Sequence, residues 1–561
     1  MLFALMSVKT DAAQLGVLTY EITNGEVTIT DCDDNAEGDL VIPAEMEGFL
    51  VTSIRFGAFS HCEGLTSITI PEGVTRIGHG AFSWCSSLTS ITIPDSVTYI
   101  GNNAFYYCSS LTSIAIPEGV TYIEGATFWY CTNLRSITIP SSVTTIGLNA
   151  FGNCSSLYSI NILEGVTRIG TGAFSNCTSL NSITIPDSVT SIGSSAFSGC
   201  RRLPSVTIPA GVTSIGPDTF YDCSSLTSIA VASGNSSYKS LDGVLLSKDG
   251  KEFFRYPEAK SGRVYTIPDS VTSIRNGAFN RCISLTSITL PESVTYIASG
   301  VFYGCSSLTS ITVASDNSKY KSLDGVLLSK DGKELLRYPE DKSGIVYTIP
   351  DSVTSIGYQA FAGCISLTSI TLPESLTGIG GSAFQLCMSL TSITLPDSVT
   401  SIGDYAFYKC SSMASIFIPS SVNAIGNSTF SECRSLASIS IPESVTTIGF
   451  RAFSDCNSLT SVTIPEVFHS RAEAERLLID HLWPDGFFLT SSSQGKSPEL
   501  SIQLAPVITV TGELDEAVTI EIADNADGPW TEWRTVVVGE DSTAEVDLDA
   551  GAEQRFYRIR N

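Results

Sequence analysis

The sequence predicts a solenoid of short repeats, a fold in which similar units stack in one dimension. Fifteen of the 16 cysteines recur at intervals of 23 residues, in three blocks at positions 62 to 223, 282 to 305 and 364 to 456. The residues between successive cysteines repeat one apolar pattern. A fixed period of roughly 20 to 50 residues is typical of solenoids, in which no single unit can bury its own apolar face. We therefore expect one long stack instead of several globular domains.

Residues 108–130 show the elements expected in each repeat. Ile114 and Ile116 alternate with small residues, which is typical of a short strand with one face in the core. Residues 120–123 form a second short apolar edge, and the glycine that follows this edge in most repeats, such as Gly101, permits a sharp turn. Stacked in register, the repeats would pair their strands into a long parallel sheet. One turn of α- or 3₁₀-helix is predicted from the helical spacing of Ala104, Phe105, Cys108 and Leu111.

The full pattern, C-x-x-L-x-x-I-x-I-P-x-x-V-x-x-I-G-x-x-A-F, resembles the BspA-like branch of the leucine-rich repeats, which occurs in bacterial surface and secreted proteins. The resemblance extends from about Leu18 to Val467. It implies a leucine-rich-repeat solenoid that serves in binding or adhesion at the cell surface, without catalysis. The chain departs from the general leucine-rich-repeat consensus where an asparagine ladder is expected, with residues such as Gly119 or Ser96 in its place.

The composition narrows the functional classes. A net charge of −26 argues against nucleic acid, whose phosphates need a basic surface, and against adsorption to anionic lipid. No apolar run approaches the roughly 20 residues of a membrane span. Gly-x-Ser-x-Gly, His-Glu-x-x-His and a complete phosphate-binding loop, Gly-x-x-x-x-Gly-Lys-Ser/Thr, are absent, so we expect no catalytic residues, no cofactor and no enzyme activity.

The cysteines are interpreted as structural. All but Cys32 share one column of the repeat, which indicates small buried hydrophobic side chains beneath the turn instead of disulfides. A metal site would need clustered ligands from several columns. The only histidines are His61, His79, His469 and His481, and we expect no metal site.

The ends of the chain depart from the regular pattern. Residues 1–15 carry a short apolar run with no basic residue before it, consistent either with a signal peptide truncated at its start or with an ordinary cytosolic start. Residues 16–61 are expected to form a capping hairpin on an Asn-Gly turn and a degenerate first repeat. The regular solenoid is assigned to residues 62–468.

Residues 469–490 have the composition of a capping amphipathic helix, and residues 491–498 that of a linker. Residues 499–561 alternate polar and apolar side chains and are similar to the fibronectin-type-III-like β-sandwich modules of secreted bacterial proteins. Spacing or attachment is the role expected for such a module.

Two insertions, at about 233–266 and 315–348, interrupt the repeats, and hairpins are predicted around Lys248-Asp249-Gly250 and its copy at Lys330. The insertions hold 12 of the 31 Lys and Arg residues, so we expect two basic, aromatic-bearing protrusions that contact a ligand. The alternative is that their aromatic side chains only pack the hairpins onto neighbouring coils. The candidate ligand-binding residues in these insertions are Tyr238, Arg255, Tyr256, Tyr320, Arg337 and Tyr338.

Three columns of the repeat are expected to face solvent. The first is a pair of hydroxyl rows on the strand, with Ser90, Thr92, Ser136 and Thr138 as further candidate ligand-binding residues. The second is an acidic column after the strand proline, interpreted as a solvated edge because specific calcium sites need several converging oxygen ligands. The third is the variable column after the valine, which fits either a binding surface or neutral drift. It includes Arg76, Tyr99, Tyr122, Arg168 and Tyr296.

These observations predict a non-catalytic, secreted or surface-displayed solenoid that binds a protein, or a glycan as second choice, on an extracellular or host surface. One alternative is a structural spacer that presents the C-terminal module. Another is an ice- or polysaccharide-binding array, because regular Thr-rich rows occur on flat solenoids of that kind.

Overall fold

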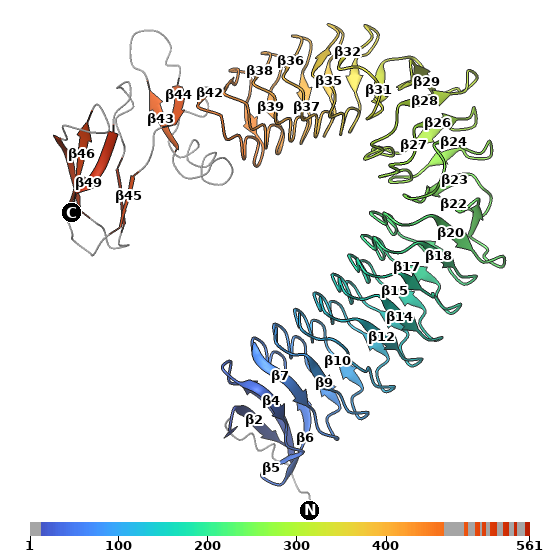
Figure 1. Cartoon of the computed structure of the whole chain (residues 1–561), viewed down its shortest axis with the longest axis vertical. Helices are drawn as coiled ribbons and strands as arrows, with labels where there is room; N and C mark the ends of the chain where they lie inside the picture. The colour runs from blue at the N-terminus through green and yellow to red at the C-terminus, as the bar shows by residue number, and fades with distance from the viewer. Residues whose placement is uncertain are drawn as a thin grey trace, which may run out of the picture. The chain divides into compact units, whose positions relative to one another are not determined.

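The computed structural model describes residues 13–464 and seven further strands between residues 487 and 560 (Figure 1). The chain divides into two compact units, Met1–Lys319 and Tyr320–Asn561. In both units, each repeat forms one coil, and most coils contribute a first strand of up to six residues and a second strand of mostly two. The predicted solenoid is confirmed. The described residues contain no helix, and hence none that could cross a membrane.

In the first unit the first strands pair in parallel with one another, and so do the second strands. Partners lie 23 residues apart, as Ser67 with Ser90 in one column and Thr145 with Arg168 in the other. The first strands are β4 (Glu37–Val41), β7 (Gly64–Thr69), β9 (Ser90–Thr92), β12 (Ser136–Ile139), β14 (Ser159–Ile162), β16 (Ser182–Ile183), β18 (Ser205–Ile208), β20 (Ser228–Val231), β24 (Val264–Thr266), β26 (Ser287–Leu290) and β28 (Ser310–Val313). The second strands are β6 (Phe49–Ile54), β8 (Arg76–Ile77), β10 (Tyr99–Ile100), β11 (Tyr122–Ile123), β13 (Thr145–Ile146), β15 (Arg168–Ile169), β17 (Ser191–Ile192), β19 (Ser214–Ile215), β25 (Ser273–Ile274) and β27 (Tyr296–Ile297).

The second unit repeats this arrangement. Its first strands are β32 (Val346–Thr348), β34 (Ser369–Thr371), β36 (Ser392–Thr394), β38 (Ser415–Phe417), β40 (Ser438–Ser440) and β42 (Ser461–Ile464). Its second strands are β33 (Ser355–Ile356), β35 (Gly378–Ile379), β37 (Ser401–Ile402), β39 (Ala424–Ile425) and β41 (Thr447–Ile448).

The predicted N-terminal hairpin is present. Strands β1 (Ala13–Leu15), β2 (Leu18–Thr23) and β3 (Glu26–Cys32) are antiparallel neighbours. Asn24 and Gly25 form the turn between β2 and β3, with φ of 57° and 80°, as a tight hairpin turn requires. β3 then pairs in parallel with β6 and closes the second-strand column, while β5 (Glu45–Met46) pairs with β6 on its own short turn.

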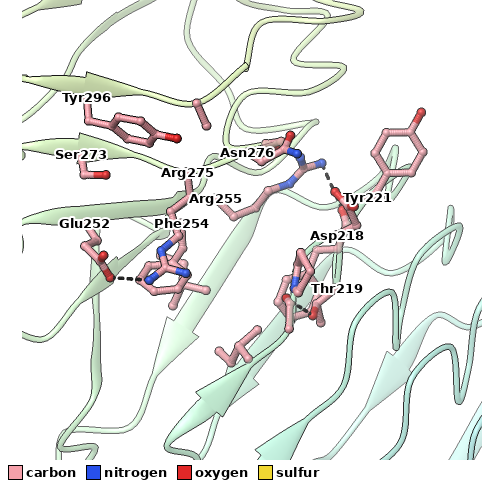
Figure 2. A pocket seen from close by; sticks show the side chains of 17 residues that line it. Asp218, Thr219, Tyr221, Glu252, Phe254, Arg255, Ser273, Arg275, Asn276 and Tyr296 are labelled. Atoms are coloured by element: carbon pink, nitrogen blue, oxygen red, sulfur yellow. Dashed lines mark hydrogen bonds and ion pairs between the residues drawn. The ribbon is translucent and has the colours of Figure 1, made fainter. Parts of the chain in front are cut away.

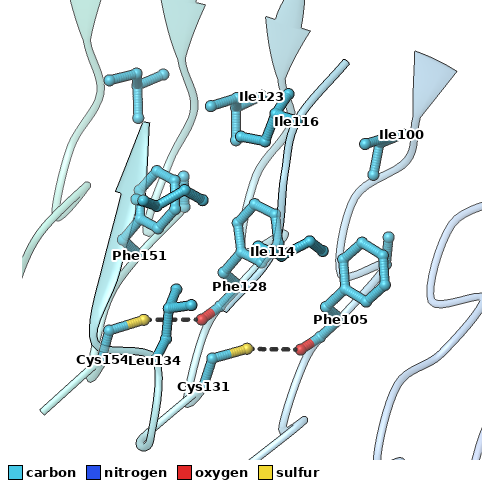
Figure 3. Packing of buried hydrophobic residues seen from close by; sticks show 14 of the residues in the cluster. Ile100, Phe105, Ile114, Ile116, Ile123, Phe128, Cys131, Leu134, Phe151 and Cys154 are labelled. Carbon is cyan, nitrogen blue, oxygen red and sulfur yellow. Dashed lines mark hydrogen bonds between the residues drawn. The ribbon is translucent and has the colours of Figure 1, made fainter. Parts of the chain in front are cut away.

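The buried cluster of each unit repeats the same side-chain types from coil to coil, as in the part of the first unit drawn in Figure 3. Phe105 stacks between Phe82 and Phe128, with ring centroids 5.4 Å apart on both sides and nearly parallel planes. All three rings are fully buried. Each coil thus supplies one layer, and each layer is buried only by the layers on either side of it.

The cysteines are buried and reduced, as predicted, and they also do more than fill space. In the regular coils each thiol donates a weak hydrogen bond to the carbonyl oxygen of the buried phenylalanine one coil earlier. Cys131 Sγ lies 3.2 Å from Phe105 O, and Cys154 Sγ lies 3.1 Å from Phe128 O (Figure 3). The thiols therefore bind successive turns together.

The predicted helical turn is wrong in its geometry. The segment that carries the buried phenylalanine and cysteine is a series of tight turns, with i to i−3 hydrogen bonds such as Phe82 O from Cys85 N–H at 3.4 Å. It does not continue as a helix because residues such as Asn103 and Tyr107 have φ of 57° and 59°, which reverses the backbone twist. We call this part of each coil the turn segment.

Glycine is required after the second strand, but for a different reason from the one expected. Gly101 and Gly193 are not among the residues with positive φ. A Cβ on Gly101 would instead lie 2.6 Å from His79 N, and one on Gly193 would lie 2.4 Å from Thr171 N. Close approach of successive coils at this corner, and not a sharp turn, excludes larger residues there.

Each insertion forms a three-stranded antiparallel meander, which confirms the predicted hairpins. In the first unit this meander is β21 (Tyr238–Leu241), β22 (Val244–Ser247) and β23 (Glu252–Arg255). In the second unit it is β29 (Tyr320–Leu323), β30 (Val326–Ser329) and β31 (Glu334–Arg337). The last strand of each meander pairs in parallel with the next second strand, β25 or β33. The insertions are therefore built into the stack and do not simply protrude from it.

The C-terminal predictions are only partly covered by the described residues. The expected helix at 469–490 falls outside them, except where β43 (Phe487–Ser491) begins. β44 (Leu500–Leu504) pairs antiparallel with both β42 and β43, so a strand lies at the sheet edge where a helix was expected. The linker at 491–498 lies outside them apart from Ser491, and the β-sandwich at 499–561 stays a prediction. Its described strands are β45 (Ile508–Thr511), β46 (Ala517–Ala523), β47 (Thr531–Val537), β48 (Thr543–Val546) and β49 (Phe556–Arg560).

The thiol column gives a first prediction. Burial raises the pKa of Cys387 and of Cys456 to about 12, and burial also raises the pKa of Cys131 well above its usual range. Because only the thiolate reacts with disulfide reagents, we expect the native protein to react negligibly with such a reagent at pH 8 and the urea-unfolded protein to show all 16 thiols. Titration with a chromogenic disulfide measures both. Rapid reaction of several thiols in the native protein would contradict the buried column.

Candidate functional site

The hydroxyl rows face solvent as expected. Ser90 and Thr92 on β9, and Ser136 and Thr138 on β12, are exposed, and the isoleucine between each pair is buried. The rows are interrupted, however, because residues 111–117 form no strand and the first-strand column separates there into β4-β7-β9 and β12-β14-β16. An open hollow of about 460 Å³ lies beside this break. Its lining includes Ser136 and Thr138.

Members of the acidic column also bind the chain itself. The Glu164 carboxylate accepts hydrogen bonds from the backbone N–H groups of Asp187 at 3.2 Å and Ser188 at 3.1 Å. These bonds lower the pKa of Glu164. Among the described residues, no three or more His, Cys, Asp or Glu side chains are grouped so that they could hold a metal ion.

The variable column contains both paired and free side chains. The Arg76 guanidinium lies 4.2 Å from the centre of the Tyr99 ring, and the Tyr99 hydroxyl lies 3.3 Å from His79 Nε2. Tyr122 and Tyr296 are exposed, at 42% and 58% of their surface. The first pair stabilises itself, whereas the two tyrosines remain accessible to a partner.

The candidate residues of the insertions are mostly inaccessible, which corrects the expectation of exposed protrusions. Tyr256 and Tyr338 are 1% exposed because they occupy the place of the buried phenylalanine in their coils. Tyr256 N–H, for example, donates to Ala278 O at 2.8 Å, as Phe59 N–H does to Ala81 O. The other candidates are also covered: Tyr238, Arg255 and Arg337 are buried, and Tyr320 is half-buried.

Arg255 is buried because it replaces interactions that the insertion removes. Its Nη1 donates to Gly277 O at 2.5 Å, and its Nη2 donates to Phe220 O at 3.1 Å. In the regular coils the phenylalanine carbonyl accepts a cysteine thiol instead, as Phe197 O does from Cys223. Nη2 also forms an ion pair of 2.5 Å with Glu258, and burial raises the pKa of Glu258 although Arg255 opposes this.

The second insertion repeats this solution. Arg337 Nη1 donates to Gln359 O at 2.5 Å, and its guanidinium pairs with buried Glu340. A buried arginine and a buried glutamate three residues later therefore hold each insertion to the coil that follows it. The alternative interpretation, that insertion side chains pack the hairpins onto neighbouring coils, describes these residues.

A feature that the sequence analysis missed lies on the turn segments of the first unit. Trp84, Tyr106, Tyr107, Trp129 and Tyr130 form a row of contacting aromatic side chains across three coils, which we call the turn ridge. Trp84 and Tyr107 stack at 4.0 Å between ring centroids, and Tyr107 and Tyr130 stack at 4.3 Å. Tyr106 meets both tryptophans edge-on. Trp84 is 37% exposed and the other four are half-buried.

The backbone of the turn ridge is strained. Trp84, Tyr107 and Tyr130 have φ of 63°, 59° and 61°, in the left-handed region that bulky side chains rarely adopt. The next coils carry Asn153 and Asn176 at this position, the residue type that tolerates it best. Ring stacking, at about 0.5–1.5 kcal/mol per pair, offsets part of this strain. The signal in the sequence was an aromatic residue directly before Cys85, Cys108 and Cys131, a position that the column analysis did not consider.

Stacked parallel coils, a shared apolar column and variable outer columns define this protein as a leucine-rich-repeat solenoid. The BspA type leucine rich repeat region, in six copies, matches residues 52–180, 146–241, 250–323 and 345–460, which together exceed half of the chain. The chain belongs to this family. No curated protein matches its sequence significantly.

Several solved structures are similar to this chain. One is a leucine rich cell surface protein of Faecalibacterium prausnitzii, with 33% identity over 72% of this chain and 94% of that one, and a TM-score of 0.49. Another is a leucine-rich repeat protein of Bacteroides ovatus, with 25% identity over 83% and 96% and a TM-score of 0.40. The pneumococcal vaccine antigen PcpA matches at 20% identity over 78% and 93%, with a TM-score of 0.33.

The buried arginine gives a second prediction. In Arg255→Met, Phe220 O loses its donor, Gly277 O keeps only the Asn280 N–H, and buried Glu258 loses its ion-pair partner, so we expect the free energy of unfolding to fall by about 3–5 kcal/mol. Urea unfolding followed by circular dichroism measures this change. Arg263→Met is the matched control, because exposed Arg263 lies in the same insertion, and its effect should stay within about 0.5 kcal/mol. Equal stability of the two variants would show that the Arg255 contacts contribute nothing.

Proposed function

We propose that this protein is a non-catalytic, secreted or cell-surface binding protein that holds a macromolecular partner, a protein before a glycan, on the turn ridge. The observation that carries the proposal is the accessible aromatic row itself. Tyrosine and tryptophan dominate the binding energy of protein interfaces, because each offers a large rigid surface and a polar group at its edge. The sequence similarity of this chain to a bacterial leucine rich cell surface protein supports the extracellular setting.

The geometry of the ridge favours a partner that crosses several coils. The stacked faces of Trp84, Tyr107 and Tyr130 cover one another, so their outer edges are the surfaces left to a partner. Aromatic edges and hydroxyl groups suit the side chains and carbonyl groups of a protein surface. Because the rings are fixed by mutual stacking, binding would cost them little conformational entropy.

The hydroxyl rows support a second function less well. An ice- or polysaccharide-binding surface needs a regular flat array, and the rows are broken between β9 and β12 and carry Phe417 where a threonine stands on the preceding strand. The structural spacer remains the competing class, and it requires that neither surface captures a partner.

The ridge gives a third prediction. The triple variant Trp84→Asn, Tyr107→Asn and Tyr130→Asn places in these coils the residue that the two following coils carry, so the backbone should be retained. We expect its capture of a partner from extracellular-matrix and cell-surface extracts to fall about tenfold or more, as loss of interface hot spots implies. Quantitative pull-down with the full chain measures this, with circular dichroism as a check on folding.

The matched control is Phe417→Thr, which removes an exposed aromatic side chain from the second unit and installs the residue of its strand partner Thr394. Its capture should equal that of the unchanged protein. Undiminished capture by the triple variant would exclude the ridge. No capture by the unchanged protein would favour the spacer.

A further inference from the structure

A cavity of about 430 Å³ lies where the first insertion rejoins the stack (Figure 2). Its walls come from three places in the first unit. Residues 215–221 of the preceding coil form one wall, and Glu252, Phe254 and Arg255 of the insertion form another. Ser273 and residues 275–277 of the following coil form the third. Tyr296, one coil further on, also lines it. The volume is in the range of small-ligand sites in proteins, and the cavity is open to solvent.

The cavity exists because one part of the insertion coil is short. This part, which we call the corner, is the backbone between the second strand and the buried aromatic residue of the turn segment. Phe253 pairs with Ile274, and Tyr256 occupies the position of Phe279. From Ile274 to Phe279 there are five positions, but from Phe253 to Tyr256 there are only three. The insertion coil therefore lacks two residues of the backbone that forms the corner in regular coils. The cavity is the space that this backbone would fill.

The missing corner leaves hydrogen-bonding groups without partners. In the preceding coil, Ser195 N–H donates to Pro217 O at 2.9 Å, and Phe197 N–H donates to Thr219 O at 3.0 Å. The corresponding donors one coil later are the N–H groups of Asp218 and Phe220. Within the described part of the chain, neither donates to another backbone group.

The opposite wall has a backbone carbonyl group that lacks the corresponding donor. In regular coils a corner carbonyl such as Pro217 O accepts the N–H of the coil before it. Asn276 O holds this position beyond the cavity, and it accepts no backbone N–H from the described residues. Phe220 is 3% exposed, and the backbone N–H groups of buried residues are paired in the great majority of cases. A bound acceptor would supply the missing partner.

Side chains of the insertion supply some of the hydrogen-bond partners that the missing corner would have provided, but they supply none for these two amides. Arg255 donates to Phe220 O, and Glu258 accepts from the Asp222 N–H. Arg255 also lines the cavity, although its Nε is fully buried. One wall of the cavity thus presents donors, and the opposite wall presents an acceptor.

The side chains around these groups suit a polypeptide. Ile215, Leu245 and Phe254 offer apolar surface, and the Arg275 guanidinium lies over Phe254 at 4.4 Å while pairing with Glu252 at 2.8 Å (Figure 2). Charges of both signs, together with unpaired backbone donors and an acceptor, match a neutral main chain better than an isolated ion.

We propose that an extended peptide segment of a partner protein binds in this cavity and takes the place of the two missing corner residues. Two carbonyl groups of the segment accept, one from the Asp218 N–H and one from the Phe220 N–H, and an N–H group of the segment donates to Asn276 O. Its side chains contact Phe254 and Tyr296. This proposal rests on the proposed function as a protein-binding surface and adds to it a second site with a defined partner chemistry.

The test uses a displayed library of random heptapeptides, selected on the full chain, followed by calorimetry with a selected synthetic peptide. Ser273→Trp should block the cavity, because Ser273 lines it and its strand partner Tyr296 shows that a bulky residue fits this column. We expect the variant to bind the peptide about tenfold or more weakly. Ser191→Trp, in the same column but away from the cavity, should bind as the unchanged protein does.

Hydrogen exchange supplies an independent readout. Without peptide, the amides of Asp218 and Phe220 should exchange faster than those of Ser195 and Phe197, and peptide should slow them. Failure to enrich any peptide, equal binding by Ser273→Trp, or unchanged exchange would overturn the proposal. Capture of a partner on the turn ridge would stand in each of these cases, so the two proposals can fail separately.

Discussion

The structure depends on hydrogen bonds between backbones of successive coils at a fixed offset of 23 residues. This ladder requires each coil to approach the next closely along its whole circumference, and the corner glycines show how closely, since a Cβ on Gly193 would lie 2.4 Å from Thr171 N. Once the offset is fixed, each buried phenylalanine lies over its counterpart in the next coil, and each cysteine thiol lies beside a phenylalanine carbonyl of the coil before it. Whatever residue occupies an outer position is also placed beside its counterpart one coil away. The turn ridge is a direct result, because three aromatic residues in successive repeats must touch.

The insertions show what happens when the ladder is interrupted. A coil that lacks its cysteine and part of its corner leaves carbonyl and amide groups without partners, and a buried arginine and glutamate supply some of them through their side chains. A buried ion pair is not in itself a strong source of stability, because desolvation opposes the attraction. Its value here is geometric: Arg255 spans from Phe220 O to Gly277 O and joins two coils that the shortened backbone cannot connect. The same pair, Arg337 and Glu340, recurs in the second unit.

Much of the fold could be predicted from the sequence, because a repeated pattern reports the same environment many times. The strand positions, the N-terminal hairpin and the buried cysteines all follow from spacing and polarity. The turn segment was mistaken for a helix because apolar spacing does not reveal residues with positive φ, such as Tyr107. The insertion residues were taken as exposed because charge normally indicates solvent. Nothing in the local sequence shows that Arg255 meets a carbonyl 35 residues earlier.

The turn ridge could have been found by reading the position before each cysteine, but its contacts required the three-dimensional register. The cavity could not have been found from sequence, since it arises from residues that are missing and not from any that are present. The shortened corner becomes visible only when Phe253 is known to pair with Ile274.

The thiol column has a consequence for how the chain reaches its folded state. In the native stack the sulfur atoms are buried and shielded from oxidants, but an unfolded chain exposes all 16 at once. Folding and disulfide formation therefore compete for the same groups, and a wrong disulfide would lock two coils out of register. Since stacking neighbours involves only local contacts, the coils can close quickly and in sequence. Under oxidising conditions, the rate of coil closure therefore determines the fraction of molecules that fold without a wrong disulfide.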